Sequence, residues 1–228
     1  MKLIKTKAIV LSRFNYGETD RILTVISPDL GKLRLIAKGS RAMKSKLAGG
    51  IELFTVNDIA FIRGRTEIAT LVSSRMNENF KFILTDINRV QFGYELLKTI
   101  NQTIEDAAES EYYDLLETTL KALNDLMIDL DITRLWFMAR LIAITGHMPN
   151  LVSEADGKSL DLDKKYNFNL DSMCFEADLK GKFMPNHIKF LRLSFSLKQP
   201  LAIAHIKEAG NMVNDLMPII SSMRQQHL

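Results

Sequence analysis

The sequence predicts an α+β protein, with a five-stranded OB-fold β-barrel at the N-terminus and a mostly α-helical domain after it. Up to about residue 75, apolar and polar residues alternate with a period of two, as in half-buried strands. After Asn79, apolar residues such as Ile87, Val90 and Tyr94 recur at helical spacing. Five short strands favour an OB-fold, although an SH3-like barrel or a small open sheet would give a similar pattern.

The five expected strands follow one another closely. The first alternates around residues 8–13, and the second covers residues 21–26 and ends in a Pro28–Gly31 turn. In the third, Leu33, Leu35 and Ala37 occupy one face, while Lys32, Arg34 and Lys38 occupy the other. The fourth and fifth span residues 54–62 and 68–74, joined by a tight hairpin at residues 63–66. A carboxylate–arginine pair is expected to hold the turn at residues 17–21.

The helical part begins at residues 85–104. Ser110 can cap a second helix. A third helix is expected to begin at Asp131 and to end at Gly146. Residues from about 148 to 184 form an irregular insert with a short hairpin around 166–175. Helix returns at 186–195 and again from Pro200 to about residue 223, with Pro218 bending or ending it. We therefore expect two domains, residues 1–78 and 79–228.

Charge is distributed unevenly along the chain. Residues 1–75 contain 14 Lys and Arg against 6 Asp and Glu, a net charge of +8, whereas the other residues sum to −5. This asymmetry indicates that the first part meets a polyanion. Cys174 is the single cysteine, which excludes an internal disulfide or a multi-cysteine zinc site and suits a reducing cytoplasm. The apolar runs are too short to span a bilayer, and the N-terminus does not resemble a signal peptide.

Catalytic chemistry finds little support in the residues. The four histidines are scattered, and pairing one of them with Cys174 is a weak hypothesis. The glycines fit no phosphate-binding loop. The pairs Asp129/Asp131 and Asp161/Asp163 could bind Mg²⁺ but are better explained as helix caps or loop residues. We expect no enzyme activity, no cofactor and no metal.

The strongest signal is the segment GKLRLIAKGSRAMKSK at residues 31–46, which has six cations and no acidic residue. Cations on an exposed strand and the following loop suit a nucleic-acid backbone, with aromatic faces for stacking. Phe14 and Tyr16 are the aromatic residues expected at the surface, whereas Phe54 and Phe61 are expected in the core. The predicted DNA-binding residues are Lys32, Arg34, Lys38, Arg41, Lys44, Lys46, Arg63, Arg65 and Tyr16.

Several of these residues also belong to a family pattern. The strings YGETDRILT at residues 16–24, GK at 31–32, AKGSR at 37–41 and KS at 44–45 resemble the RecO recombination-mediator family, as does the segment ITGHMPNL at 144–151. The resemblance covers the barrel well and the helical domain loosely. It implies a cytoplasmic, nucleoid-associated DNA-repair protein without catalytic chemistry.

The resemblance also implies partners. It implies binding of single- and double-stranded DNA, annealing of complementary strands, and joint action with RecR to load RecA onto strands coated by the single-stranded-DNA-binding protein. Arg134, Arg140 and Lys189 are candidate anchors for the C-terminal tail of that protein. Many family members have four zinc-binding cysteines in the insert, where this chain has Cys174 alone, so we expect no zinc. An OB-fold module for RNA or protein, or an unrecognised hydrolase, are the alternatives.

Overall fold

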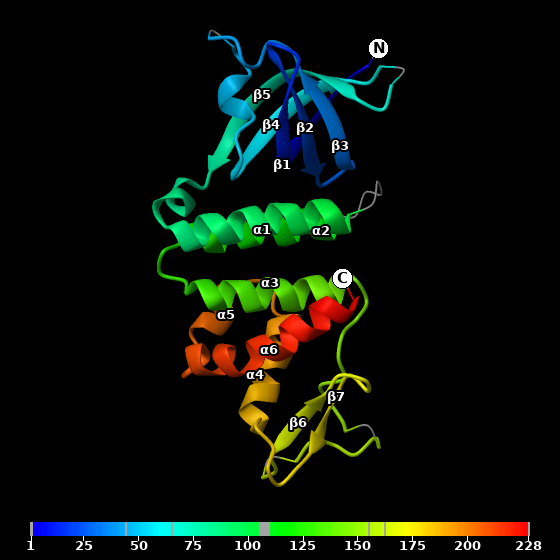
Figure 1. Cartoon of the computed structure of the whole chain (residues 1–228), viewed down its shortest axis with the longest axis vertical. Coiled ribbons are helices and arrows are strands. Elements are labelled where there is room, and N and C mark those ends of the chain that lie inside the picture. Colours follow the sequence, from blue (N-terminus) through cyan, green and yellow to red (C-terminus); the bar gives the residue numbers. More distant parts are fainter. Residues whose placement is uncertain are drawn as a thin grey trace. The chain divides into compact units, whose positions relative to one another are not determined.

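The computed structural model describes residues 2–43, 45–64, 66–104, 110–154, 156–161 and 163–227. They form two compact units, Met1–Asp125 and Leu126–Leu228. The first contains a five-stranded sheet and two helices, and the second contains helices and a small hairpin (Figure 1). The predicted boundary between residues 78 and 79 falls at the end of the last strand of the sheet, within the first unit.

The sheet consists of β1 (Leu3–Tyr16), β2 (Asp20–Ser27), β3 (Gly31–Ala37), β4 (Thr55–Ile62) and β5 (Ala69–Asn79). The strands pair in the order β1-β2-β3-β5-β4, and β4 pairs back to β1, so the sheet rolls up into a barrel. All ladders are antiparallel except the short parallel contact between β3 and β5. This confirms the predicted fold, an OB-like sheet followed by helices.

Side chains at every second strand position fill the inside of the barrel. They include Ala8 and Val10 of β1, Leu35 and Ala37 of β3, and Phe61 of β4, all buried. The intervening residue Ile9 is fully buried as well. Because α1 contacts β1, the helix covers this outer stretch of the strand. Part of the sheet is therefore buried on both faces.

Helix α1 (Ile87–Thr103) follows a short 3₁₀ turn, η2 (Lys81–Thr85), and is capped by Asp86, whose side chain accepts from the N–H groups of Asn88 and Arg89. It approaches the sheet closely at Gly93, where a Cβ atom would lie 2.8 Å from Cε1 of Phe54. Phe54 has a positive φ of 59° and makes an edge contact with Tyr94 at a centroid distance of 5.3 Å. Glycine is therefore required here for helix and sheet to pack.

The second helix of this unit, α2 (Ser110–Asn124), contacts α1 and β2. Ser110 is its first helical residue, and the preceding residues 105–109 lie outside the described part of the chain, so the expected cap is not tested. Arg89 of α1 is buried and donates to the main-chain oxygens of Leu123 and Asp125, which close the end of α2. This contact joins the two helices.

The second unit is built on α3 (Leu130–Ile144), α4 (Pro185–Ser196), α5 (Leu201–Ala204) and α6 (Ala209–His227). Trp136 of α3 is buried and donates through Nε1 to the oxygen of Leu197, 2.9 Å away. The insert contains the expected hairpin, β6 (Tyr166–Asn169) and β7 (Cys174–Ala177). Gly146 follows α3 with φ +82°, which confirms the predicted helix end.

Three details of the prediction are wrong. Helix α3 begins at Leu130, because Asp129 rather than Asp131 caps it. The last helical stretch is interrupted between α5 and α6, where Glu208 has φ +63°, and α6 runs to His227. Pro218 lies inside α6, so of its two predicted effects the ending of the helix does not occur. Strand β5 runs five residues beyond the expected end, because its polar C-terminal half still pairs with β4.

Candidate nucleic-acid interface

Strand β3 presents its cations outward because its apolar residues point into the barrel. Leu35 and Ala37 are fully buried, and Arg34, between Leu33 and Leu35, is exposed. Lys38, just after the strand, is exposed too. Neither Arg34 nor Lys38 has a carboxylate within the 4.0 Å that defines an ion pair among the residues described. Their charges are therefore available to a ligand.

Lys32 differs from these two residues. It is only half-exposed, and its amino group donates to the main-chain oxygens of Asn101 and Ile104, at 2.7 and 3.2 Å. Both oxygens lie at the C-terminal end of α1, where helical carbonyls lack partners and the dipole is negative. Lys32 thus has a structural role, and its predicted contact with DNA stays a prediction.

The loop after β3 is fastened to the turn between β1 and β2. The Asp20 carboxylate accepts from the N–H of Gly39 at 2.8 Å and from the Thr19 hydroxyl at 3.0 Å, and these hydrogen bonds lower its pKa. The N–H of Arg41 donates to the oxygen of Thr19, 2.9 Å away, and its guanidinium to that of Gly17 at 3.2 Å. The loop is therefore held in place at its N-terminal end.

The expected carboxylate–arginine pair in this turn is wrong. Arg21 Nε lies 3.4 Å from the side-chain oxygen of Asn15, and the Asp20 carboxylate is satisfied by a main-chain N–H instead. The donor is the N–H of Gly39, in the loop that follows β3 and returns to this turn. The spacing of residues within the turn could not predict this contact.

A hollow of about 560 Å³ opens between β3 and the loop that joins β4 to β5. Lys32 and Arg34 line it from the strand and Arg63 from the loop, so the fold brings these predicted residues together. Glu67 adds one carboxylate to the lining. Arg63 is exposed and makes no ion pair with any residue that the structure describes. The hollow can therefore hold an anion such as a phosphate group.

Two aromatic side chains stand at the end of β1. Phe14 and Tyr16 are 53% and 54% exposed and, as residues i and i+2, lie on one face of the strand. Phe54 and Phe61, by contrast, are buried, so both expectations are confirmed. Tyr16 pairs with Asp20, whose carboxylate holds the loop of Lys38 and Arg41. Exposed rings beside cations suit the stacking of unpaired bases.

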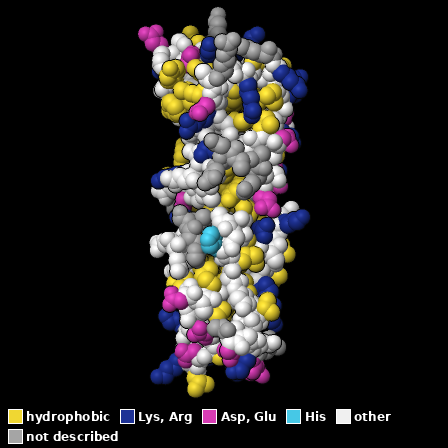
Figure 2. Space-filling model, turned by 90° about the vertical axis from the view of Figure 1, so that its right-hand side faces the viewer, with side chains coloured by type: hydrophobic (Ala, Val, Ile, Leu, Met, Phe, Trp, Pro, Cys, Tyr) yellow, Lys and Arg dark blue, Asp and Glu magenta, His cyan; other side chains and the backbone are white. Residues whose placement is uncertain are grey.

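The three other predicted DNA-binding residues are Lys44, Lys46 and Arg65. Lys46 is exposed beyond the loop, and Lys44 and Arg65 lie outside the described residues. We define the β3 surface as Arg34, Lys38, Arg41 and Arg63. Figure 2 shows Lys and Arg side chains in dark blue over the upper end of the view, where the sheet lies.

A second basic hollow, of about 460 Å³, was not anticipated from the sequence. It lies on the outside of β1, β4 and β5, and Lys5, Lys7 and Arg75 line it together with Asp58. Lys5 and Lys7 alternate with half-buried residues in β1, and this alternation is the signal that could have pointed to them. Their proximity to Arg75 depends on strand register, which the sequence does not reveal.

No metal-binding cluster is found within the described part of the chain. There, no three His, Cys, Asp or Glu side chains are grouped so as to hold a metal ion. Cys174 is buried, and His187 Nε2 lies 3.1 Å from Asp215. Asp129 caps α3, in agreement with the prediction that the acidic pairs are helix caps or loop residues rather than Mg²⁺ ligands. None of the helices described here is long and apolar enough to cross a membrane.

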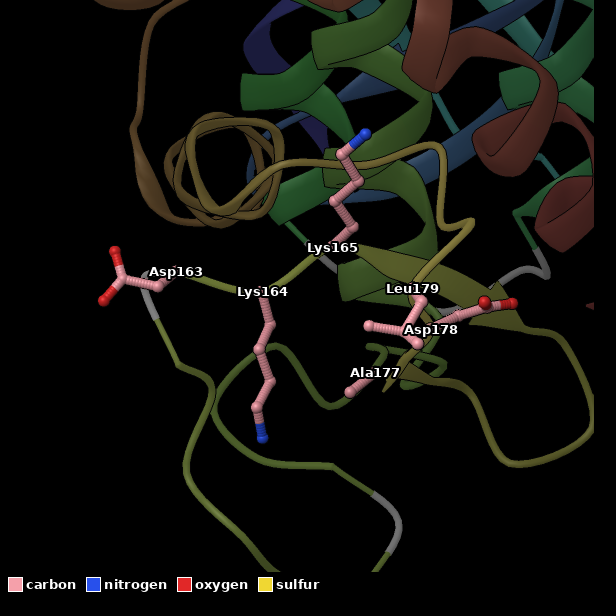
Figure 3. Close-up of a pocket in the computed structure, with 6 residues that line it drawn as sticks. All are labelled: Asp163, Lys164, Lys165, Ala177, Asp178 and Leu179. Atoms are coloured by element: carbon pink, nitrogen blue, oxygen red, sulfur yellow. The ribbon is translucent and has the colours of Figure 1, made fainter.

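The insert contains a further hollow, of about 380 Å³, beside Ala177–Leu179. Figure 3 shows that the amino groups of Lys164 and Lys165 point away from each other, and that the Asp163 and Asp178 carboxylates lie on opposite sides. Because its charged groups diverge, this hollow lacks a focus for a polar ligand.

Comparison with known proteins gives two family matches. The model of the Recombination protein O N terminal family matches residues 1–80, and that of the Recombination protein O C terminal family matches residues 84–201. "DNA repair protein RecO" of Thermoanaerobacter sp. is 30% identical over the whole chain and 94% of its own length. The protein of the same name from Acetivibrio thermocellus is 31% identical, over 78% of this chain and 73% of the relative.

Proposed function

The chain belongs to the Recombination protein O family, and on that premise we propose that it is a non-catalytic mediator of recombinational DNA repair. In this proposal, the N-terminal sheet, predicted as a domain at residues 1–78, binds single- and double-stranded DNA and promotes the annealing of complementary strands. The names of its relatives support a role in DNA repair. The observation that carries DNA binding is the β3 surface, on which Arg34, Lys38 and Arg63 lack carboxylate partners among the described residues.

The β3 surface suits binding that tolerates many sequences. Cations on a strand and a fastened loop contact phosphates, which are the same in every DNA sequence. Phe14 and Tyr16 add faces on which any base can stack. Backbone contacts combined with non-selective stacking are what a protein needs to hold unpaired strands of arbitrary sequence before they anneal.

The proposal includes partners and a location. The protein acts in the cytoplasm at the nucleoid, with RecR, to help RecA load onto strands coated by the single-stranded-DNA-binding protein. For the tail of that protein, Lys189 is the most accessible of the three candidate anchors, because it is exposed. Arg140 donates to the oxygen of Phe195, and Arg134 pairs with Asp131 at 3.6 Å. No cofactor or metal is needed for this role.

Strand annealing without Mg²⁺ tests the proposal. The variant Lys38→Glu/Arg41→Glu/Lys44→Glu should bind a labelled single strand at least about tenfold more weakly and anneal correspondingly slowly. The matched control, Lys164→Glu/Lys180→Glu/Lys182→Glu, makes the same charge change on the insert, where all three lysines are exposed. Urea unfolding checks that the first variant remains folded, since Arg41 contacts the Gly17 oxygen.

Unchanged affinity in the first variant, or equal losses in both variants, would contradict the assignment. For wild type, phosphate contacts by five cations, the four of the β3 surface and Lys44, predict a slope of log K against log salt of about −3.5 for single strands. Tighter binding to structured RNA than to DNA would favour an RNA-binding module instead.

A further inference from the structure

The second hollow results from the register of three neighbouring strands. Lys7 of β1 lies opposite Asp58 of β4, and Asp58 lies opposite Arg75 of β5. One step along, Lys5 lies opposite Ala60, which lies opposite Ser73. The short side chains of Ala60 and Ser73 form a floor between longer cationic side chains, which is why the surface is hollow here. We call Lys5, Lys7 and Arg75 the β1 surface.

The cations of this surface are available to a ligand. All three are exposed, and within the described chain none makes an ion pair or a side-chain hydrogen bond. The Asp58 carboxylate accepts from the amide of Asn77 at 3.3 Å and leaves the hollow with a net charge of +2. A hollow with three cations spread over two strands matches successive phosphates better than a single small anion.

The two basic surfaces lie at different parts of the β4–β5 hairpin. In the strand order, β5 and β4 lie between β3 and β1, and the hollow beside Arg34 is lined by β3 and the β4–β5 loop, whereas the hollow beside Lys7 is lined by β1 and the middle of β4 and β5. Between them, β5 presents Thr70 and Val72, neither of which can neutralise a phosphate. On the outer face of β5, the stretch between the β4–β5 loop and Arg75 therefore offers no cation to a DNA strand.

We propose that the β1 surface holds the phosphate backbone of a second DNA strand while the β3 surface holds the first. This inference rests on the proposed function, because it explains how one sheet can bring two strands together for annealing. The uncharged stretch of β5 between the two surfaces keeps the strands apart until their bases pair.

The experiment uses the full chain and two polythymidine strands, which cannot pair, one labelled with a donor and the other with an acceptor fluorophore. Energy transfer reports both strands on one protein, and the anisotropy of one strand reports the first binding step. The β1 variant is Lys5→Glu/Lys7→Glu/Arg75→Glu, with a milder Lys5→Gln/Lys7→Gln/Arg75→Gln form in case the charge reversal affects folding. The Lys164→Glu/Lys180→Glu/Lys182→Glu protein is the control.

The β1 variant should bind the first strand within about threefold of wild type but lose the energy-transfer signal and anneal at least about tenfold more slowly. The glutamine form should do the same to a lesser degree. Energy transfer and annealing like those of wild type would overturn the inference. It is also overturned if the β1 variant loses as much first-strand affinity as the Lys38→Glu/Arg41→Glu/Lys44→Glu variant, because the two surfaces would then hold one strand.

These outcomes are distinct from a failure of the proposed function. That failure would appear as wild-type protein that neither binds nor anneals DNA, or as a Lys38→Glu/Arg41→Glu/Lys44→Glu protein, here called the β3-surface variant, that behaves like wild type. A normal β1 variant alongside a defective β3-surface variant would reject the second strand site and leave DNA binding at β3 intact.

Discussion

The amino group of Lys32 donates a hydrogen bond to the main-chain oxygen of Asn101, 2.7 Å away, and so joins strand β3 to the last turns of helix α1. A cation at this end of a helix is stabilising, because the last carbonyls are unpaired and carry the negative end of the dipole. The most prominent basic strand of the protein therefore contains one residue that supports the fold and another, Arg34, that faces outward.

Replacing Lys32 by methionine should lower the free energy of unfolding by about 1 kcal/mol, since two helix carbonyls lose a charged donor but gain access to water. Urea unfolding monitored by circular dichroism measures this change. Arg34→Met is the matched control, expected to leave stability unchanged and to weaken DNA binding more than Lys32→Met does. Equal stability of the two variants would show that the contact of Lys32 with α1 contributes nothing.

Replacing Asp20 by alanine should loosen the loop of Lys38 and Arg41, because Gly39 loses its hydrogen-bond acceptor. In the folded protein the pKa of Asp20 lies below its ordinary value of 3.8, so its stabilising effect is present above that pH and is lost as the pH falls through the folded pKa. The difference in unfolding free energy between wild type and Asp20→Ala should therefore be greatest near neutral pH and shrink below about pH 4.

Urea titrations at several pH values check this expectation, with Asp171→Ala, at an exposed site, as control. A difference that grows on acidification would contradict the role given to Asp20. Faster hydrogen exchange at the Gly39 amide in the variant would identify the loop itself as the part that loosens.

Replacing Phe14 and Tyr16 by alanine should weaken single-strand binding by about 1–3 kcal/mol for each base that loses its stacking partner. The slope of affinity against salt should stay the same, because no cation is removed. Fluorescence anisotropy at several salt concentrations measures both quantities. Phe82→Ala, which removes an exposed ring elsewhere in the same unit, should bind like wild type. A changed salt slope, or a single-strand affinity equal to that of wild type, would contradict a stacking role for Phe14 and Tyr16.

The sequence predicted the class and order of most elements because their patterns are local. Leu35 and Ala37 alternate with polar neighbours, and the interior of a barrel requires that alternation. Predictions failed where a distant contact decides the outcome. The polar end of β5 pairs with β4 although its composition resembles a loop.

The candidate site shows the same division. The charge of the segment around β3 is visible in one stretch of sequence, and the structure places Arg34 and Arg63 around one hollow. The role of Lys32 at the end of α1 could not be seen, because its acceptors lie 69 and 72 residues away along the chain. The grouping of Lys7 with Arg75 depends in the same way on the register of three strands.

The close packing at Gly93, which has no Cβ atom, determines which fragments of the protein are suitable for experiments. The ring of Phe54 occupies the space where a Cβ would be, and Ile9 is buried where α1 contacts β1. A fragment truncated at Asn79 would expose these apolar groups to water and would tend to aggregate. Truncation after Asp125 retains α1 and α2 and leaves the interior of this unit covered. The sheet alone is thus a poor substitute for the whole unit in binding studies.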